Sequence, residues 1–175
     1  MSHVIIRSEE QKEVKLVKRN TRKNMQLVQL SDIHVGSFFK QQVFDTVVEE
    51  INKLKPDAII ITGDLTDEGL LCQSEYASAQ IKKFTCSNII VLAGNHDYRH
   101  AGYLVFKKFF PLAKQQIYEF DDDVVLVTLG TARPDRDEGE VGYRQNLWME
   151  NTLEKYGNGN NKKKKRQRLL RCITI

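Results

Sequence analysis

Three short apolar runs, each followed at once by a polar cluster, constrain the fold of this chain more than any other feature. The runs are MQLVQL (25–30), AIII (58–61) and NIIVLAG (88–94), and the polar stretches that follow them are SDIHVG, TGD and NHD. Short runs rich in β-branched residues predict buried strands. Polar groups at the end of a buried strand cost free energy unless something pairs with them. The clusters are therefore either loops of ordinary polarity or parts of a site that binds a cation.

The segments between and after these runs have the spacing of helices or of further strands. Apolar residues in 41–55 recur at helical intervals and Pro56 follows directly, which predicts a helix that ends there. Helices are also predicted at 74–84, 103–110 and 144–156, and strands at 117–120 and 124–130. Apolar strands that alternate with helices predict an α/β fold with a sheet buried on both faces.

The polar clusters fall where such a fold gathers its functional groups, just beyond the carboxyl ends of parallel strands. Neighbouring strands lie about 5 Å apart, so side chains just past their ends converge. The clusters supply Asp32 and His34, then Asp64, then Asn95. Two carboxylates, an imidazole and an amide oxygen form a ligand set that suits Mn, Fe or Zn, whereas calcium avoids imidazole. Asp64, in the middle loop, is placed to bridge two ions.

Each motif also has an ordinary interpretation. A lone D-x-H after a strand is usually a loop or a helix cap, a GD pair is usually a turn, and GNHD is polar enough for a surface turn. His3 and His100 are interpreted as surface histidines. The metal site is favoured because three separate strand ends carry compatible ligands in one chain.

The motifs SDIHVG, ITGDLTD and LAGNHD, in this order, resemble the first three motifs of the calcineurin-like metallophosphoesterases, D-x-H, G-D and G-N-H-[DE]. The resemblance covers about residues 25–156, and YRQNLWMENTLEKY is similar to the helix that precedes the family's fourth motif. It implies the N-terminal half of a four-layer αββα sandwich. It also implies a metal-dependent hydrolase of phosphate esters, either a phosphodiesterase or a phosphatase, whose activity we expect to be impaired in this chain because the family's later motifs are missing.

The resemblance further implies a dinuclear metal site with Mn, Fe or Zn as its ions. Asp32 and His34 would bind the first ion, Asp64 would bridge both, and Asn95 would bind the second. The two ions would share a hydroxide that attacks the phosphorus of the ester in line.

Two neighbouring residues are implied to assist this reaction. His96 would protonate the leaving alkoxide or stabilise the phosphoryl oxygens. Asp97 would orient His96 by accepting the other ring N–H, as carboxylates commonly do for functional histidines.

The sequence departs from the family after its third motif. No histidine follows His100, so the family's later histidine ligands have no counterpart, and the second ion is left with Asp64 and Asn95. The second half of the sandwich is also expected to be absent, which would expose one face of the sheet to water. An alternative function is therefore a catalytically inactive fragment that acts as a binding or regulatory module.

Two basic segments flank the domain predicted at 25–156. Residues 1–24, interpreted as an N-terminal extension, hold seven basic and three acidic residues, and residues 157–175 hold seven basic and no acidic ones. The second segment is interpreted as a disordered basic tail or as the product of a frameshift in an adenine-rich tract. Codons for RQRLLRCITI, read in another frame, can encode an apolar strand that ends in histidines and resembles the missing fourth motif. Nucleic-acid binding through the basic ends is a further alternative.

The charge and the cysteine content narrow the choice of binding partner and of cellular compartment. Residues 25–156 hold 13 basic and 20 acidic residues, a balance that suits a metal centre better than a nucleic-acid groove. Cys72, Cys86 and Cys172 have no paired spacing, which predicts a reducing compartment. No apolar window reaches the length of a membrane span, so we expect a cytoplasmic protein without membrane contact. The sequence does not indicate an oligomeric state.

Overall fold

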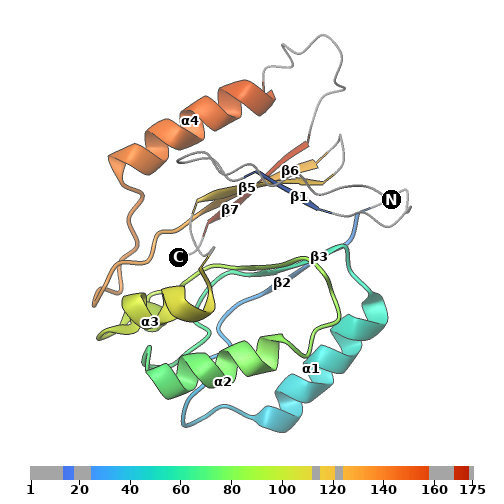
Figure 1. Ribbon diagram of the computed structural model, residues 1–175, viewed down its shortest axis with the longest axis vertical. Coiled ribbons are helices and arrows are strands. Elements are labelled where there is room, and N and C mark those ends of the chain that lie inside the picture. Colours follow the sequence, from blue (N-terminus) through green and yellow to red (C-terminus); the bar gives the residue numbers. More distant parts are fainter. Residues whose placement is uncertain (1–13, 18–24, 112–114, 121–123, 158–167, 174–175) are drawn as a thin grey trace.

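Two β-sheets lie face to face in this chain, and helices cover the outer side of each (Figure 1). The structure is a computed structural model that describes residues 14–17, 25–111, 115–120, 124–157 and 168–173. Its layers follow the order helix, sheet, sheet, helix. This is the four-layer αββα architecture of which the sequence resemblance implied the N-terminal half.

The first sheet consists of three parallel strands in the order β2-β3-β4. Its strands are β2 (Leu27–Leu30), β3 (Ala58–Ile61) and β4 (Ile89–Val91). The helices on its outer face are α1 (Gln41–Leu54), α2 (Leu71–Ile81) and α3 (Gly102–Phe109). Each of these elements falls within, or a few residues from, the range that its sequence pattern predicted.

The middle strand β3 is buried on both faces. Its successive side chains point to opposite sides, one covered by the helices and the other by the second sheet. Ile59 and Ile61 belong to the core cluster beneath the helices, where they pack with Phe44 of α1 and other apolar residues. Ala58 and Ile60 belong to a second cluster that lies between the two sheets. This double burial explains why the strand is an uninterrupted apolar run.

The second sheet has four strands in the order β1-β5-β6-β7. Its strands are β1 (Val14–Val17), β5 (Gln116–Phe120), β6 (Val124–Leu129) and β7 (Arg168–Ile173). β5 and β6 pair antiparallel, whereas β1 pairs with β5 and β7 pairs with β6 in parallel. The helix α4 (Tyr143–Gly157) lies over the outer face of this sheet, where Tyr156 packs with Val125 and Val127.

The expectation that one face of the first sheet is open to water is wrong. Tyr118 and Phe120 of β5 and Leu126 of β6 pack against Ala58 and Ile60 between the sheets. Successive side chains of β5 and β6 point to opposite sides of their sheet. Apolar residues on one side therefore cover the first sheet, and apolar residues on the other side pack beneath α4.

Sheet pairing extends beyond the predicted domain limits of 25 and 156. Val14–Val17 forms β1, paired with β5, rather than part of an added hairpin, and Val4–Ile6 lies outside the described residues. β7 lies within the segment predicted as a disordered or frameshifted tail. The frameshift interpretation stays a prediction.

Candidate metal centre

The loops that follow β2 and β3 run side by side and continue the pairing of those strands. The backbone N–H of Asp32 donates to the carbonyl of Gly63 (3.2 Å), and that of His34 donates to the carbonyl of Asp64 (2.9 Å). Val35 then pairs with Thr66 as an isolated bridge. The two polar clusters are therefore held in register by main-chain hydrogen bonds, independently of their side chains.

Three residues of the site have a backbone in the left-handed conformation. The φ angles are +57° at Asp32, +48° at His34 and +50° at Asp64. Residues other than glycine adopt this conformation at a cost, and such residues concentrate at functional sites. The surrounding structure must therefore stabilise an unfavourable backbone conformation at all three of these residues.

Two glycines allow the loops after β3 and β4 to touch. A Cβ atom at Gly63, whose φ is +115°, would lie 2.6 Å from the backbone nitrogen of Gly94. A Cβ atom at Gly94 would lie 2.1 Å from Oδ1 of Asp64. Neither position has room for a larger residue, so both glycines are required for Asp64 to lie against the third motif.

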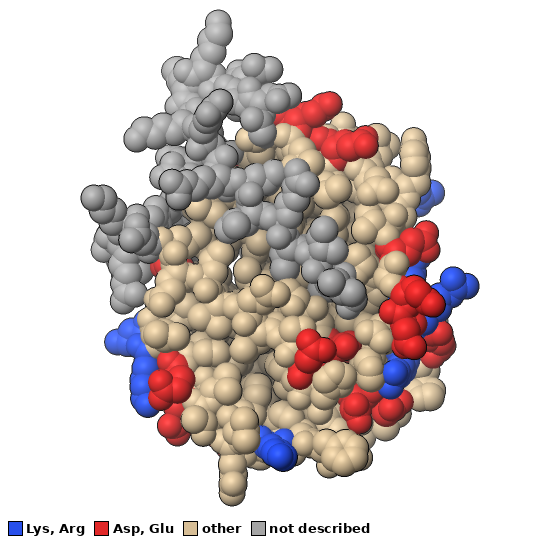
Figure 2. Space-filling model, turned by 180° about the vertical axis from the view of Figure 1, so that it is seen from behind, with Lys and Arg blue, Asp and Glu red and all other residues tan. Residues whose placement is uncertain are grey.

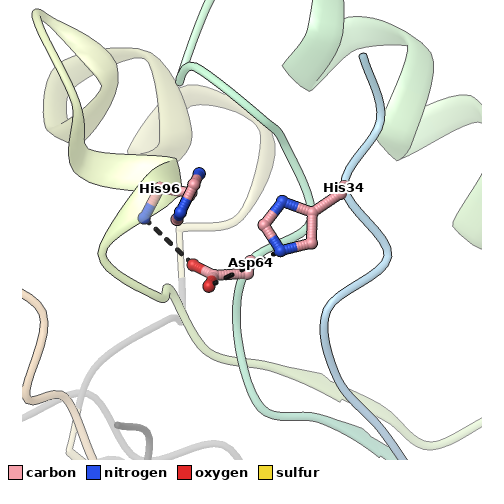
Figure 3. A group of neighbouring side chains, drawn as sticks. All are labelled: His34, Asp64 and His96. Atoms are coloured by element: carbon pink, nitrogen blue, oxygen red, sulfur yellow. Dashed lines mark hydrogen bonds and ion pairs between the residues drawn. The ribbon is translucent and has the colours of Figure 1, made fainter. Parts of the chain in front are cut away.

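Figure 3 shows the cluster that results, with His34, Asp64 and His96 contributed by three different loops. One ligand atom from each residue can be chosen so that all lie within 4.8 Å of one another. Nε2 of His34 lies 3.9 Å from Oδ2 of Asp64, and the backbone N–H of His96 donates to Oδ1 of Asp64 at 3.0 Å. The two imidazole rings meet edge to face, with centroids 4.6 Å apart.

Asp32 also lies near Nε2 of His34. Its Oδ1 is 3.7 Å from Nε2 of His34, and its side chain is 66% exposed. The same ring nitrogen thus faces a carboxylate oxygen from Asp32 and one from Asp64. The structure brings these two carboxylates to one imidazole, as the sequence predicted.

Asn95 directly precedes the short 3₁₀ helix η1 (His96–Tyr98), whose first residue belongs to the cluster. Its Nδ2 donates to Oδ1 of Asp137 at 3.1 Å. A carboxylate only accepts hydrogen bonds, so the nitrogen of the amide faces Asp137 and the amide oxygen faces away from it. The assignment of Asn95 as a metal ligand stays a prediction.

Asp97 does not orient His96 as the sequence analysis expected. Its side chain is fully buried, and its oxygens accept hydrogen bonds from the backbone N–H groups of Leu65, Thr66 and Gly94 and from the Thr66 hydroxyl. Successive residues of a 3₁₀ helix point roughly 120° apart, which directs Asp97 inward when His96 points outward. Asp97 instead ties the loop after β3 to the loop after β4.

Burial also changes the acidity of Asp97. Loss of hydration raises the pKa of its carboxyl group to about 6, although the hydrogen bonds from Gly94, Thr66 and Leu65 stabilise the anion and act in the opposite direction. The Asp97 carboxyl group thus connects two loops from a buried position that raises its pKa. None of its described hydrogen bonds involves the ring of His96.

Asp67 is a residue of the site that the sequence analysis missed. Its backbone carbonyl lies 2.7 Å from Nδ1 of His96, and its Oδ1 lies 3.4 Å from Nδ1 of His34. A Cβ atom at Gly36 would lie 2.5 Å from Cβ of Asp67, so the loops are in direct contact here. The signal available in the sequence was the second aspartate of GDLTD, three residues after Asp64.

Comparison with known proteins settles the family. The family model described as calcineurin-like phosphoesterase matches residues 25–169. This chain belongs to that family.

Several relatives of this chain are longer proteins. An uncharacterized metallophosphoesterase of Helicobacter pylori is 31% identical over 78 residues, which are 45% of this chain and 21% of that protein. A probable cyclic nucleotide phosphodiesterase of Rhodococcus erythropolis is 29% identical over 145 residues, 73% of this chain and 46% of that protein. The chain therefore spans about a fifth to a half of the length of these relatives.

A solved structure supports the fold. The NAD nucleotidase of Haemophilus influenzae superposes with a TM-score of 0.54 at 14% identity, over 85% of this chain and 34% of that one. Among the described residues, no helix combines the length and apolar character needed to cross a membrane. A zebrafish relative, 37% identical over 76 residues, is named a transmembrane protein with a metallophosphoesterase domain, and the cytoplasmic location stays a prediction.

The clustered residues of this chain fit a divalent ion. Two ligands that are each about 2.1 Å from one ion lie roughly 3 to 4 Å apart, and the separations of 3.7 and 3.9 Å from Nε2 of His34 to Asp32 and Asp64 agree with this. Imidazole nitrogen and carboxylate oxygen together suit Mn, Fe or Zn. The geometry is therefore that of a site able to hold such an ion.

Proposed function

We propose that this chain carries the metal-binding centre of a phosphate-ester hydrolase, a phosphodiesterase or a phosphatase with two divalent ions as its cofactor. The observation that carries the proposal is the convergence of His34, Asp64 and His96 from three strand ends, with Asp32 on the same imidazole. Membership of the calcineurin-like phosphoesterase family supports phosphate esters as the substrate class.

The ligands would be divided between two ions. Asp32 and His34 would hold the first ion, Asp64 would reach both, and Asn95 would hold the second. Divalent ions in these positions supply Lewis acidity, which lowers the pKa of water that attacks phosphorus and neutralises the negative charge of the ester.

His96 is suited to handle the proton of the leaving group. The carbonyl oxygen that faces its Nδ1 at 2.7 Å can only accept a hydrogen bond. Nδ1 therefore carries the ring hydrogen in the neutral state, and Nε2 is the atom that takes up and releases a proton. Asp67 fixes this arrangement through its main chain, which gives His96 one orientation toward the leaving alkoxide.

A catalytically inactive binding or regulatory module is the second candidate. It is favoured by the short ligand set of the second ion, which has only Asp64 and Asn95 among the predicted ligands.

Calorimetric titration with Mn²⁺ and Zn²⁺, followed by an assay of manganese-dependent hydrolysis of bis(p-nitrophenyl) phosphate, separates the two candidates. The hydrolase is expected to bind metal and to lose turnover in Asp64→Ala and His96→Ala. Metal binding no tighter than on the order of millimolar, together with an absence of turnover, favours the inactive module.

A further inference from the structure

The loop between β6 and α4 is anchored on the third motif by its acidic residues. Oδ1 of Asp135 accepts a hydrogen bond from the backbone N–H of His100 at 2.6 Å, and the backbone N–H of Asp135 donates to the carbonyl of Tyr98 at 3.4 Å. A salt bridge of 2.7 Å between Arg133 and Glu140 closes the loop on itself. These contacts place residue 137 beside Asn95.

This loop belongs to an acidic edge of the molecule. In Figure 2, which shows the molecule from behind, acidic side chains gather along the right-hand edge with basic ones among them. In Figure 1 the same edge carries the loop between β6 and α4, whose exposed acidic residues are Asp135, Asp137, Glu138 and Glu140.

Asp137 makes two contacts that distinguish it from its neighbours. Its Oδ1 accepts a hydrogen bond from Nδ2 of Asn95 at 3.1 Å and lies 3.8 Å from Nη2 of Arg99. The side chain is 83% exposed, so burial does not hold it in place. Polar contacts with a predicted metal ligand and with one arginine define its position.

We propose that Asp137 is a positioning residue that turns the amide of Asn95 so that its oxygen is available to the second metal ion. The inference rests on the proposed function. An asparagine amide binds a cation through oxygen and not through nitrogen. Because the acceptor-only carboxylate of Asp137 engages the nitrogen, it selects the one amide orientation that leaves the oxygen free.

Arg99 explains why Asp137 acts through Asn95 instead of serving as a ligand. Nη1 of Arg99 donates to the carbonyl of Asp67 at 3.3 Å and to Glu68 at 3.2 Å, while Nη2 faces Asp137. The guanidinium thus offsets part of the charge of Asp137 and shares its oxygen with Asn95. The same arginine contacts the carbonyl that faces His96, so the two positioning contacts are joined by one side chain.

The experiment measures how many Mn²⁺ ions the full chain binds and how tightly it binds each of them. Mn²⁺ binding is measured by calorimetry, and electron paramagnetic resonance reports whether two bound ions are spin-coupled. We expect the wild type to bind two coupled ions. Asp137→Ala weakens the second ion about tenfold or more and the first little, because partners of metal ligands typically contribute 10–100-fold to affinity.

Two further variants separate positioning from other roles. Asp137→Asn keeps an acceptor oxygen for Asn95 but adds a competing N–H donor, and we expect it to restore only part of the second-ion affinity. Asn95→Asp offers two equivalent oxygens, so adding Asp137→Ala to it is expected to cause no further loss. Glu138→Ala, which removes an exposed carboxylate of the same loop, is the matched control and leaves both affinities unchanged.

Several results would overturn the inference. If the wild type and Asp137→Ala bind the second ion with equal affinity, the inference is contradicted. It is also contradicted if Asp137→Asn loses as much affinity as Asp137→Ala, because the carboxylate itself would then be the ligand. A wild type that binds a single ion overturns the inference but keeps the first metal site. A wild type that binds no ion removes the proposed function as well.

Discussion

The Asp64 carboxylate accepts a hydrogen bond from the backbone N–H of His96 at 3.0 Å, and this contact joins the end of β3 to the beginning of η1. One oxygen of Asp64 is thereby fixed by the main chain of the third motif, while the other faces Nε2 of His34 at 3.9 Å. A carboxylate held in this way has each of its oxygens directed to a different neighbour, which is the property that a bridging ligand needs.

Asp64→Asn is expected to abolish metal binding and to keep the fold. The asparagine oxygen can still accept the hydrogen bond from the His96 main chain, but the negative charge that attracts a cation is lost. Calorimetric titration with Mn²⁺ should show no saturable binding, while the thermal unfolding curve of the metal-free protein stays within a few degrees of the wild type. Metal binding of unchanged affinity would contradict the assigned role.

Gly94→Ala is expected to lower both stability and metal affinity. Its Cβ would lie 2.1 Å from Oδ1 of Asp64, and relief of such an overlap costs about 1–3 kcal/mol of unfolding free energy. Chemical denaturation measures the loss. Gly130→Ala is the matched control, because a Cβ at Gly130 meets nothing within 4 Å, and a loss of equal size in both variants would argue against the steric explanation.

Asp97 is expected to make the metal-free protein less stable as the pH rises from about 4 to 6. Its folded-state pKa of about 6 lies above the ordinary value of 3.8, so in this window the native state holds a proton that the unfolded state has released. The stabilisation, about 3 kcal/mol at most, is fully present below the unfolded pKa and is lost as the pH passes through the folded one. Denaturant titrations at several pH values measure it.

Asp97→Asn provides the comparison for this dependence. The amide has no titrating proton, so the unfolding free energy of this variant should lack the component that falls between pH 4 and 6. The difference between the two pH profiles, and not the stability at one pH, isolates Asp97 from the other carboxylates. Parallel profiles would show that the carboxyl group does not titrate in this range.

Asp67→Ala is expected to reduce metal affinity by about 10- to 100-fold, the usual effect of removing a carboxylate that orients a histidine ligand. The carboxylate lies 3.4 Å from Nδ1 of His34 and 4.0 Å from Nδ1 of His96. The shorter contact with His96, at 2.7 Å, comes from the main chain and survives the substitution. Calorimetry with Mn²⁺ measures the change, with Asp45→Ala on α1 as a control away from the site. An affinity within twofold of the wild type would refute the orienting role.

Most of the helices and strands could be predicted from the sequence because their signals are local, whereas β7 lies in a segment that was predicted as a disordered or frameshifted tail. The apolar spacing of α1 and the unbroken apolar run of β3 each determine one element within a few residues. The pairing of β1 with β5 could not be predicted in this way, since it aligns Val14 with Ile117, and no pattern within either strand identifies a partner so distant along the chain.

The convergence of His34, Asp64 and His96 could be predicted from the sequence, but the hydrogen-bond partners of these residues could not. The order of motifs placed Asp64 beside His34, since strand ends converge in any parallel sheet of this kind. The sequence analysis expected Asp97 to orient His96, but the main chain of Asp67 contacts that ring instead. This difference depends on the direction in which η1 turns and on the contact of Gly36 with Asp67. Such choices arise from packing between loops, and the types of the residues alone do not reveal them.

The four hydrogen bonds that Asp97 accepts have a consequence for how a cation would be received. They are made entirely within the polypeptide, so the loops that present the ligands are braced before any ion arrives. Little conformational entropy then has to be lost on metal binding, and the empty and loaded forms should share one backbone. We therefore expect that one ion can replace another at the proposed site without a change in the backbone.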